Sequence, residues 1–200
     1  MADPITFYFD FSSPYAYFGA LKIDEIAEAF DREVDWRPIL LGVTMKATGN
    51  VSLAHQPVKS EYSKHDWERL SRFMDVPWTL PEQFPIATMA AARAFYWIKD
   101  TDEALAKKFA LACFHRYFGE GQDITDRQTV AEIGETFGIN REELLAAVER
   151  DDIKQRLRDE TQAATDAGVC GAPYFIVDGE PFWGSDRLWM IRRWLKSGGW

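Results

Sequence analysis

The sequence predicts an α/β protein in which a long helical segment interrupts a small sheet. Patterns typical of strands occur near both ends of the chain, at residues 5–10, around Val34 to Ile39, and in a hairpin pattern at residues 174–183. Between them, from about residue 59 to residue 167, apolar residues recur at helical spacing. A chain of 200 residues suits one domain with a large insertion and is long enough to bury a core.

Residues 5–18 predict a buried strand followed by a helix. The apolar run Ile-Thr-Phe-Tyr-Phe stops at Asp10, and its length is consistent with a strand of a parallel sheet. Ser13-Pro14 is a helix-start signal, because the hydroxyl caps free N–H groups and proline is tolerated at the first helical position. The predicted helix, 14–30, places Ser13 where a strand end meets the positive end of a helix, as in many ligand sites. Most such serines are caps only, so both roles stay open.

The other elements follow from the same kind of pattern. Val34, Trp36 and Ile39 alternate with polar neighbours and predict a second strand, which Pro38 interrupts. Residues 43–58 are rich in Gly, Thr, Asn, Ser and Pro and predict a long functional loop. Asp126 and Asn140 mark helix starts. The helices predicted for the insertion cover residues 59–75, 85–99, 102–118, 126–137, 141–149 and 152–167.

The C-terminal residues predict a hairpin and a final helix. Tyr174-Phe-Ile-Val and Pro181-Phe-Trp flank the turn signal Asp178-Gly179, and Gly184-Ser185-Asp186 begins a helical pattern. The order β-α-β, helical segment, β-β-α is that of a thioredoxin-like domain. The sequence therefore predicts a thioredoxin-like domain formed by residues 1–58 and 168–200, with residues 59–167 as an all-helical insertion.

Composition narrows the classes of function. The chain has 23 basic and 32 acidic residues, a net charge of −9, and no basic cluster, which argues against nucleic acids and anionic membranes as partners. No apolar stretch approaches the length of a membrane span, and Met-Ala-Asp-Pro is no secretory signal. Eight tryptophans and fourteen phenylalanines supply buried area and can line a pocket for a flat organic ligand.

The cysteines and histidines predict neither a metal site nor a disulfide. Cys113 and Cys170 lie far apart, and the three histidines show no ligand spacing. A chain without disulfides fits a reducing cytoplasm. We expect Cys113 to be a buried apolar residue on a helix and Cys170 to be a small buried residue.

Gly171-Ala172-Pro173, just before the hairpin, is the second candidate part of a site. In a thioredoxin-like layout a cis proline at this place lies beside the start of the first helix. A cis X-Pro bond is uncommon, and the residue before it presents a backbone edge that an extended peptide can pair with. An ordinary trans proline at the start of a strand is the alternative.

Five short motifs occur in order along the chain: Phe-Asp-Phe-Ser-Ser-Pro-Tyr-Ala-Tyr-Phe at 9–18, Leu-Gly-Val-Thr-Met-Lys-Ala-Thr-Gly-Asn at 41–50, Pro57-x-Lys59-x-x-Tyr62, Gly171-Ala-Pro, and Trp183-Gly-Ser-Asp-Arg187. Together they resemble the motifs of 2-hydroxychromene-2-carboxylate isomerases, which are relatives of kappa-class glutathione transferases and DsbA-like oxidoreductases. The resemblance runs from about residue 5 to residue 195. Where the oxidoreductases carry Cys-x-x-Cys, this chain reads Ser13-Pro14-Tyr15-Ala16, so dithiol redox chemistry is excluded at this place.

The resemblance implies glutathione as the cofactor. Ser13 matches the position that contacts the glutathione sulfur, and Ala172, before Pro173, matches the residue whose backbone pairs with the cysteinyl unit. Ser185 and Asp186 match the positions that receive the γ-glutamyl end, with Trp183 and Gly184 beside them. Asp186 suits an ammonium group, although Ser-Asp at a helix start is equally good capping chemistry. A mixed disulfide between glutathione and Cys170 is a further, less favoured alternative.

The resemblance also implies a reaction and a second substrate. The family isomerises 2-hydroxychromene-2-carboxylate to trans-o-hydroxybenzylidenepyruvate during the catabolism of aromatic compounds such as naphthalene, with the glutathione thiolate as the nucleophile. For the anionic aromatic keto acid, Lys46 matches a substrate-contacting lysine. Asn50 and Lys59 lie in the matching loop and helix, and Phe84 falls where some members place a tyrosine. The correspondence between residues 51–58 and the family's motifs stays open. The resemblance also implies a homodimer, because family members are usually homodimers.

Two alternative functions remain at the level of the sequence. A kappa-like glutathione transferase or peroxidase would share the site up to the sulfur and differ in the pocket for the electrophile. A redox-inactive thioredoxin-like module would capture an extended peptide at the backbone edge before Pro173 and would need neither the lysines nor Asp186.

Overall fold

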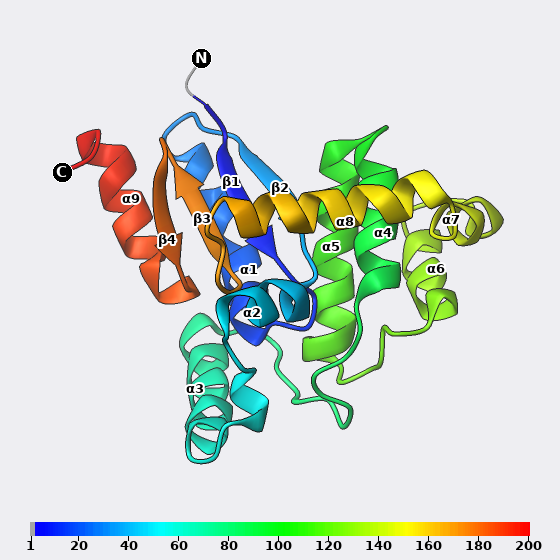
Figure 1. The fold of residues 1–200 in the computed structure, drawn as a ribbon, viewed down its shortest axis with the longest axis horizontal. Coiled ribbons are helices and arrows are strands. Elements are labelled where there is room, and N and C mark those ends of the chain that lie inside the picture. Colours follow the sequence, from blue (N-terminus) through cyan, green and yellow to red (C-terminus); the bar gives the residue numbers. More distant parts are fainter. Residues whose placement is uncertain (1–2) are drawn as a thin grey trace.

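A four-stranded mixed sheet lies at the centre of the N-terminal and C-terminal parts of the chain. The computed structural model describes residues 3–200. The strands are β1 (Ile5–Phe9), β2 (Val34–Pro38), β3 (Tyr174–Val177) and β4 (Glu180–Trp183). Their order in the sheet is β2-β1-β3-β4, with β1 parallel to β2, antiparallel to β3, and β3 antiparallel to β4. The predicted order of elements, β-α-β followed much later by β-β-α, is therefore present (Figure 1).

Strand β1 is buried on both faces, as its continuous apolar run predicts. Ile5, Phe7 and Phe9 are fully buried in the main core. Tyr8 faces the other way, into a smaller cluster that includes Ala164 of α8 (Asp151–Asp166). Helix α8 crosses this second face in Figure 1. Helices α1 (Pro14–Glu28) and α9 (Leu188–Ser197) contact each other and contribute Ile23 and Ile191 to the main core.

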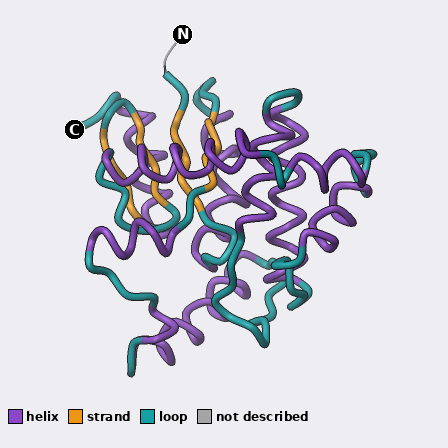
Figure 2. The backbone as a smooth tube through the Cα atoms, turned by 45° about the vertical axis from the view of Figure 1, so that its right-hand side comes forward, coloured by secondary structure: helices purple, strands orange, loops and turns teal. Residues whose placement is uncertain are grey.

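Residues 59–167 form helices and connecting loops in the structure. The helices are α3 (Lys59–Met74), α4 (Met89–Lys99), α5 (Glu103–Phe114), α6 (Arg127–Glu135), α7 (Arg141–Ala147) and α8. In Figure 2 the strands gather in one part of the molecule and helices fill the rest. One core runs through both parts, because the ring of Phe9 packs 5.7 Å from Phe95 of α4 and 5.7 Å from Phe114 of α5, between ring centroids.

The division into domains at residues 1–58, 59–167 and 168–200 stays a prediction, and residues 1 and 2 lie outside the described part of the chain. Within residues 3–200, no helix combines the length and the apolar character that a bilayer-spanning segment requires. Cys113 is fully buried on α5, as expected, and burial raises the pKa of its thiol.

Several local signals are confirmed by the backbone. Ser13 is the N-cap of α1, with Pro14 as its first residue. Asp126 and Asn140 are the N-caps of α6 and α7, accepting from the N–H groups of Gln128 and Glu143. Asp178 and Gly179 have φ angles of 53° and 85°, so both residues of the hairpin turn are left-handed, which a primed turn requires.

The predicted loop at 43–58 is wrong in its first half. Residues Leu41–Thr48 form helix α2, which ends at Gly49 with a φ of 72°, and a short 3₁₀ turn follows at Leu53–His55. The composition misleads because the hydroxyls of Thr44 and Thr48 bond to backbone carbonyls within the helix. The first N–H of α2 is accepted by Asp10, a contact between residues far apart in sequence.

The predicted helices differ from the observed ones by a few residues at their ends, and the differences are largest for the helices expected at 85–99 and 102–118. The helix expected at 85–99 begins at Met89, after its N-cap Thr88. The one expected at 102–118 ends at Phe114 and continues as a π turn, His115–Gly119. The first helix ends at Glu28. Each difference arises at a terminus, and at two of them the apolar pattern continues beyond the helix because Ile86, Tyr117 and Phe118 pack in or against the core.

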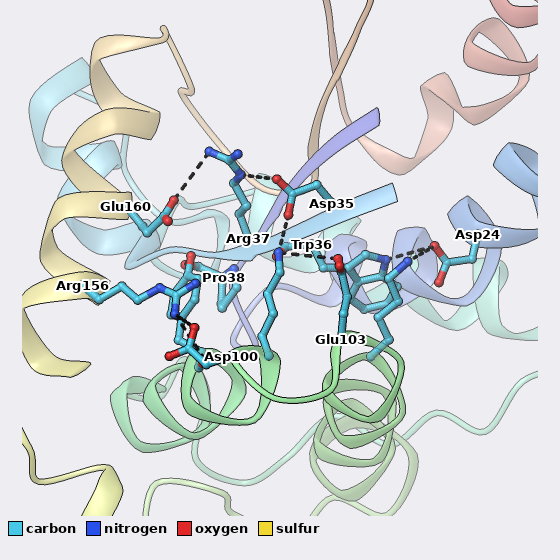
Figure 3. Close-up of polar contacts among 12 residues, drawn as sticks. Asp24, Asp35, Trp36, Arg37, Pro38, Asp100, Glu103, Arg156 and Glu160 are labelled. Carbon is cyan, nitrogen blue, oxygen red and sulfur yellow. Dashed lines mark hydrogen bonds and ion pairs between the residues drawn. The ribbon is translucent and has the colours of Figure 1, made fainter. Parts of the chain in front are cut away.

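Charged residues join the outer strand β2 to the helical part of the molecule (Figure 3). Lys99, at the end of α4, forms an ion pair with Asp35 and donates a hydrogen bond to the Trp36 carbonyl over 3.0 Å. Burial alone would raise the pKa of Asp35, but hydrogen bonds and charge from Lys99 and Arg37 bring this pKa below its usual value. Two further contacts of β2 are the ion pair Arg37–Glu160 and the hydrogen bond from the Tyr96 hydroxyl to the Pro38 carbonyl, while Lys107 of α5 pairs with Asp24 of α1.

Replacing Lys99 by methionine is expected to destabilise the protein by about 1–3 kcal/mol near neutral pH, because it leaves the charged Asp35 with Arg37 as its one remaining cationic partner among residues 3–200. The two side chains keep only 15% and 20% of their surface exposed, so solvent screens the pair weakly. Since the folded-state pKa of Asp35 is lowered, its stabilisation exists above its unfolded pKa of about 4 and is lost as pH falls through the folded value. Denaturant unfolding at pH 7 and pH 3 measures the difference, which should shrink in acid. Lys22→Met, in an exposed pair with Glu25, is the control.

Candidate active site

The hydroxyl of Ser13 joins the tip of α1 to the loop before β3. Its Oγ accepts a hydrogen bond from the Ala16 N–H over 3.2 Å and donates one to the Ala172 carbonyl over 2.8 Å. Ser13 is 5% exposed. The residue is therefore a helix cap and also a link between two segments separated by 159 positions in sequence. Ser13 can therefore cap the helix and also contribute to a binding site.

The Ala172–Pro173 peptide bond is cis, as the sequence pattern predicts. Pro173 packs against α1 at Gly19, where an added Cβ would lie 3.3 Å from two atoms of the proline ring. Among residues 3–200, the backbone N–H groups of Tyr15 and Ala172 have no hydrogen-bond acceptor. Two unpaired donors therefore lie in the segments that the Ser13 hydroxyl brings together, one of them in the first turn of a helix, where the dipole favours negative charge.

Asn50 lies near the same loop. Its Nδ2 donates to the Cys170 carbonyl over 3.0 Å, so the residue that follows α2 is tied to the segment preceding Ala172. Cys170 is half-buried, whereas the sequence predicted a buried residue. The difference arises because Cys170 belongs to the loop that leads to the sheet, whose neighbour Val169 is buried instead. The roles of Asn50 and Cys170 toward a ligand stay predictions.

Trp183 ends β4, and Gly184, Ser185 and Asp186 follow it next to that loop. The Trp183 ring packs on Gly171 so closely that an added Cβ there would lie 2.3 Å from Nε1. Gly184 has a φ of 105° and donates its N–H to the Pro173 carbonyl over 2.9 Å. Ser185 begins the 3₁₀ turn Ser185–Arg187, which precedes α9.

The carboxylate of Asp186 does not cap the turn or the helix that follows. Neither the 3₁₀ turn nor α9 has a side-chain cap among the described residues. Asp186 is 71% exposed and pairs with Arg187 over 2.8 Å. The sequence allowed two roles for Asp186, capping a helix and binding an ammonium group. The structure does not show the capping role, and the carboxylate faces solvent.

Lys46 and Lys59 flank the segment that links α2 to α3. Both are exposed, and among residues 3–200 the ion pairs of lysine involve Lys22, Lys64, Lys99, Lys107 and Lys154 instead. Val58, directly before Lys59, has a φ of 68°. A β-branched residue in the left-handed region is strained, and such strain gathers at functional segments.

Phe84 belongs to an aromatic cluster beside the first turn of α1. Its ring lies edge-on to Trp67 at 5.4 Å between centroids, and Trp67 lies 6.1 Å from Tyr15. Trp67 is 2% exposed, and its Nε1 is buried without a hydrogen-bond partner. The Tyr15 hydroxyl donates to Asp66 over 2.9 Å, and burial raises the pKa of Tyr15, with Asp66 adding to the effect.

Asp10 has contacts that sequence reasoning missed. This carboxylate is 4% exposed and accepts four hydrogen bonds, from the N–H and hydroxyl of Ser12, the N–H of Leu41 and the hydroxyl of Thr88. Burial raises its pKa, and these hydrogen bonds act in the opposite direction. The available signal was a single acidic residue that ends an otherwise apolar strand directly before Ser-Ser-Pro.

Comparison with known proteins places this arrangement in a family. The model of the DSBA-like thioredoxin domain matches residues 4–196. The chain belongs to the DSBA-like thioredoxin family. The predicted fold class, an α/β thioredoxin-like domain with a large helical insertion, is thereby confirmed. Instead of a cysteine pair, this DSBA-like chain carries Ser13-Pro14-Tyr15-Ala16 at the tip of α1.

The relatives of this DSBA-like chain carry two kinds of name. A 2-hydroxychromene-2-carboxylate isomerase from Sphingobium xenophagum is 30% identical over 197 residues, which cover 98% of this chain and 99% of the relative. Glutathione S-transferase kappa 1 from Caenorhabditis elegans is 28% identical over 206 residues, covering 96% and 91%. A solved structure of 2-hydroxychromene-2-carboxylate isomerase superposes with a TM-score of 0.88 at 26% identity, covering 96% of this chain and 94% of that one.

Proposed function

We propose that the protein is a glutathione-dependent isomerase that converts 2-hydroxychromene-2-carboxylate to trans-o-hydroxybenzylidenepyruvate in the catabolism of aromatic hydrocarbons. The observation that carries the proposal is the Ser13 hydroxyl, which lies at a helix N-terminus, bonded to Ala172, with no thiol at this place in the chain. The chain has an arrangement suited to holding a sulfur and lacks a sulfur of its own there. The names of its relatives point to the same reaction.

The donors at the site fit glutathione. The N–H of Ala172 is open, and its carbonyl can accept a second hydrogen bond beside that from Ser13, so the backbone of this residue can pair with a peptide unit. Asp186 can bind the ammonium of the γ-glutamyl end, with Ser185 and the Trp183–Gly184 backbone beside it. Glutathione bound there would supply a thiolate nucleophile.

The residues of the chain would hold that sulfur in its reactive form. The N-terminus of α1 lowers the pKa of a thiol placed against it. The Ser13 hydroxyl would turn its proton from the Ala172 carbonyl toward the sulfur. Ser13 would not attack the substrate itself, because the hydroxyl has hydrogen bonds only to Ala16 and Ala172 within residues 3–200, and neither group is a base.

The segment from α2 to α3 would receive the aromatic keto acid. Lys46 and Lys59 would neutralise its carboxylate and the charge that develops beside it. Phe84, with the cluster around Trp67, offers an aromatic wall, and Asn50 lies between α2 and the loop of Ala172. The homodimer and the cytoplasmic location stay predictions.

The test is the dependence of turnover on a free thiol. Protein freed of glutathione is expected not to convert the chromene acid, whereas added glutathione restores conversion, followed by the change in ultraviolet absorbance. S-methylglutathione, which has the same peptide and no thiol, is the control and should not restore it. Conversion by protein rigorously free of glutathione would contradict the proposal.

A kappa-like glutathione transferase is the second candidate, favoured by the relatives that carry that name. Such a transferase would bind glutathione and its sulfur in the same way and would differ in the pocket for the electrophile. Turnover of the chromene acid and of an aryl halide, both with glutathione, separates the two functions. Reaction of the halide alone would assign the transferase. A peptide-binding module without enzymatic activity would give no heat in calorimetry with reduced glutathione.

A further inference from the structure

The carboxylate of Asp10 connects three segments of the candidate site. Its Oδ1 accepts from the N–H and the hydroxyl of Ser12, in the turn before α1, over 2.8 Å and 2.9 Å. The same oxygen accepts from the hydroxyl of Thr88, the N-cap of α4, over 2.8 Å. Its Oδ2 accepts from the N–H of Leu41, the first residue of α2, over 2.8 Å. One buried group therefore fixes the starts of α2 and α4 relative to the start of α1.

The bond to Leu41 supplies what α2 lacks. The N-cap of this helix is Leu40, which has no side-chain oxygen, and α2 has no side-chain cap. Helix α2 has eight residues and carries Lys46 in its last turn, and it is followed by Asn50. In Figure 1 it lies at the end of the sheet where β1 finishes. The distant carboxylate of Asp10 thus stands in for the missing cap and holds α2 to the turn that presents Ser13.

We propose that Asp10 is a positioning residue whose hydrogen bond to the Leu41 N–H sets the place of the Lys46 helix relative to Ser13. The inference rests on the proposed function. Asp10 does not touch the reacting groups. Its carboxylate keeps the helix that binds the aromatic acid in register with the turn that holds the sulfur, and misplacing such a group by about 1 Å costs on the order of a hundredfold in rate.

Two variants remove the same bond from opposite sides. Asp10→Asn keeps the larger number of hydrogen bonds when its oxygen takes the place of Oδ1, against Ser12 and Thr88, which turns its amide donor toward the Leu41 N–H and removes that bond. Leu41→Pro removes the N–H itself, at the first helical position where proline is tolerated and after an extended Leu40 (φ −88°, ψ 93°). Leu41→Ala is the matched control, because it loses the side chain and keeps the N–H. Thr88→Val removes a different bond to the same carboxylate.

Both variants are expected to raise the KM for the aromatic acid about tenfold or more, while the Kd for glutathione in calorimetry stays unchanged. Amide hydrogen exchange over residues 41–48 should accelerate in both, and Leu41→Ala and Thr88→Val should keep the KM of the wild type. If Asp10→Asn does not fold, Leu41→Pro decides alone.

Two outcomes are distinguishable from each other. A wild-type protein without glutathione-dependent turnover contradicts the proposed function, and the exchange of residues 41–48 then still shows whether the bond holds α2. A wild-type protein that turns over, with a Leu41→Pro variant whose KM equals that of Leu41→Ala, overturns the role assigned to Asp10.

Discussion

Replacing Ser13 by alanine is expected to lower kcat by about a hundredfold. This is the usual effect of removing one positioned hydrogen-bond donor from a negative charge at the reacting centre, here the charge on the glutathione sulfur. The hydroxyl is the group that joins the start of α1 to Ala172. The Kd for glutathione should change much less, because the Ala172 backbone and Asp186 remain to hold the peptide. Steady-state kinetics with the chromene acid and calorimetry with glutathione measure the two quantities on one preparation.

Asn140→Ala is the matched control for this prediction. Asn140 caps α7 just as Ser13 caps α1, so each alanine variant is expected to lose about 1 kcal/mol of stability as a lost cap. Only the Ser13 variant should lose turnover. Equal kinetics in the two variants would leave Ser13 as a cap and would remove the main support for the proposed function.

Replacing Phe9 by alanine is expected to destabilise the protein by about 3–5 kcal/mol, the usual cost of truncating a buried phenylalanine. The side chain is fully buried and packs against rings from β2, α4 and α5, those of Trp36, Phe95 and Phe114. The resulting cavity would lie where the sheet meets the helical segment. For a chain of this size the loss corresponds to roughly 10 °C in Tm, measurable by calorimetry or circular dichroism.

Phe73→Ala provides the comparison for Phe9. Phe73 is 85% exposed near the end of α3, so removing its ring should change the free energy of unfolding by less than about 0.5 kcal/mol. A similar Tm for the two variants would show that the sheet and the helical segment are not stabilised by a shared aromatic core.

Much of the fold was predictable because its signals are local. The apolar run of β1, the Ser13-Pro14 helix start and the Asp178-Gly179 turn each depend on a few adjacent residues. Helix α2 was missed because its support comes from elsewhere. Asp10 accepts its first N–H, and a composition rich in threonine and glycine hides a helix whose hydroxyls bond internally.

The candidate site was predictable only in part, for a related reason. The serine and the cis proline are marked by short motifs, whereas the bonds from Ser13 to Ala172 and from Asn50 to Cys170 span more than a hundred positions. The environment of Trp67, whose N–H is buried without a partner, depends on rings from several segments. Such contacts are set by the packing of the whole chain and leave no local pattern.

The two outer strands of the sheet, β2 and β4, carry residues that disfavour pairing with a strand of another chain. Strand β2 carries Asp35 and Arg37, which pair with residues of the helical segment, and β4 carries Pro181, which has no N–H to offer a neighbouring strand. Charge and proline at sheet edges are known to discourage the pairing of one chain with another. The two edges of the sheet therefore disfavour the addition of another strand. The unpaired N–H of Ala172, which is not at a sheet edge, can still bind the backbone of a short peptide.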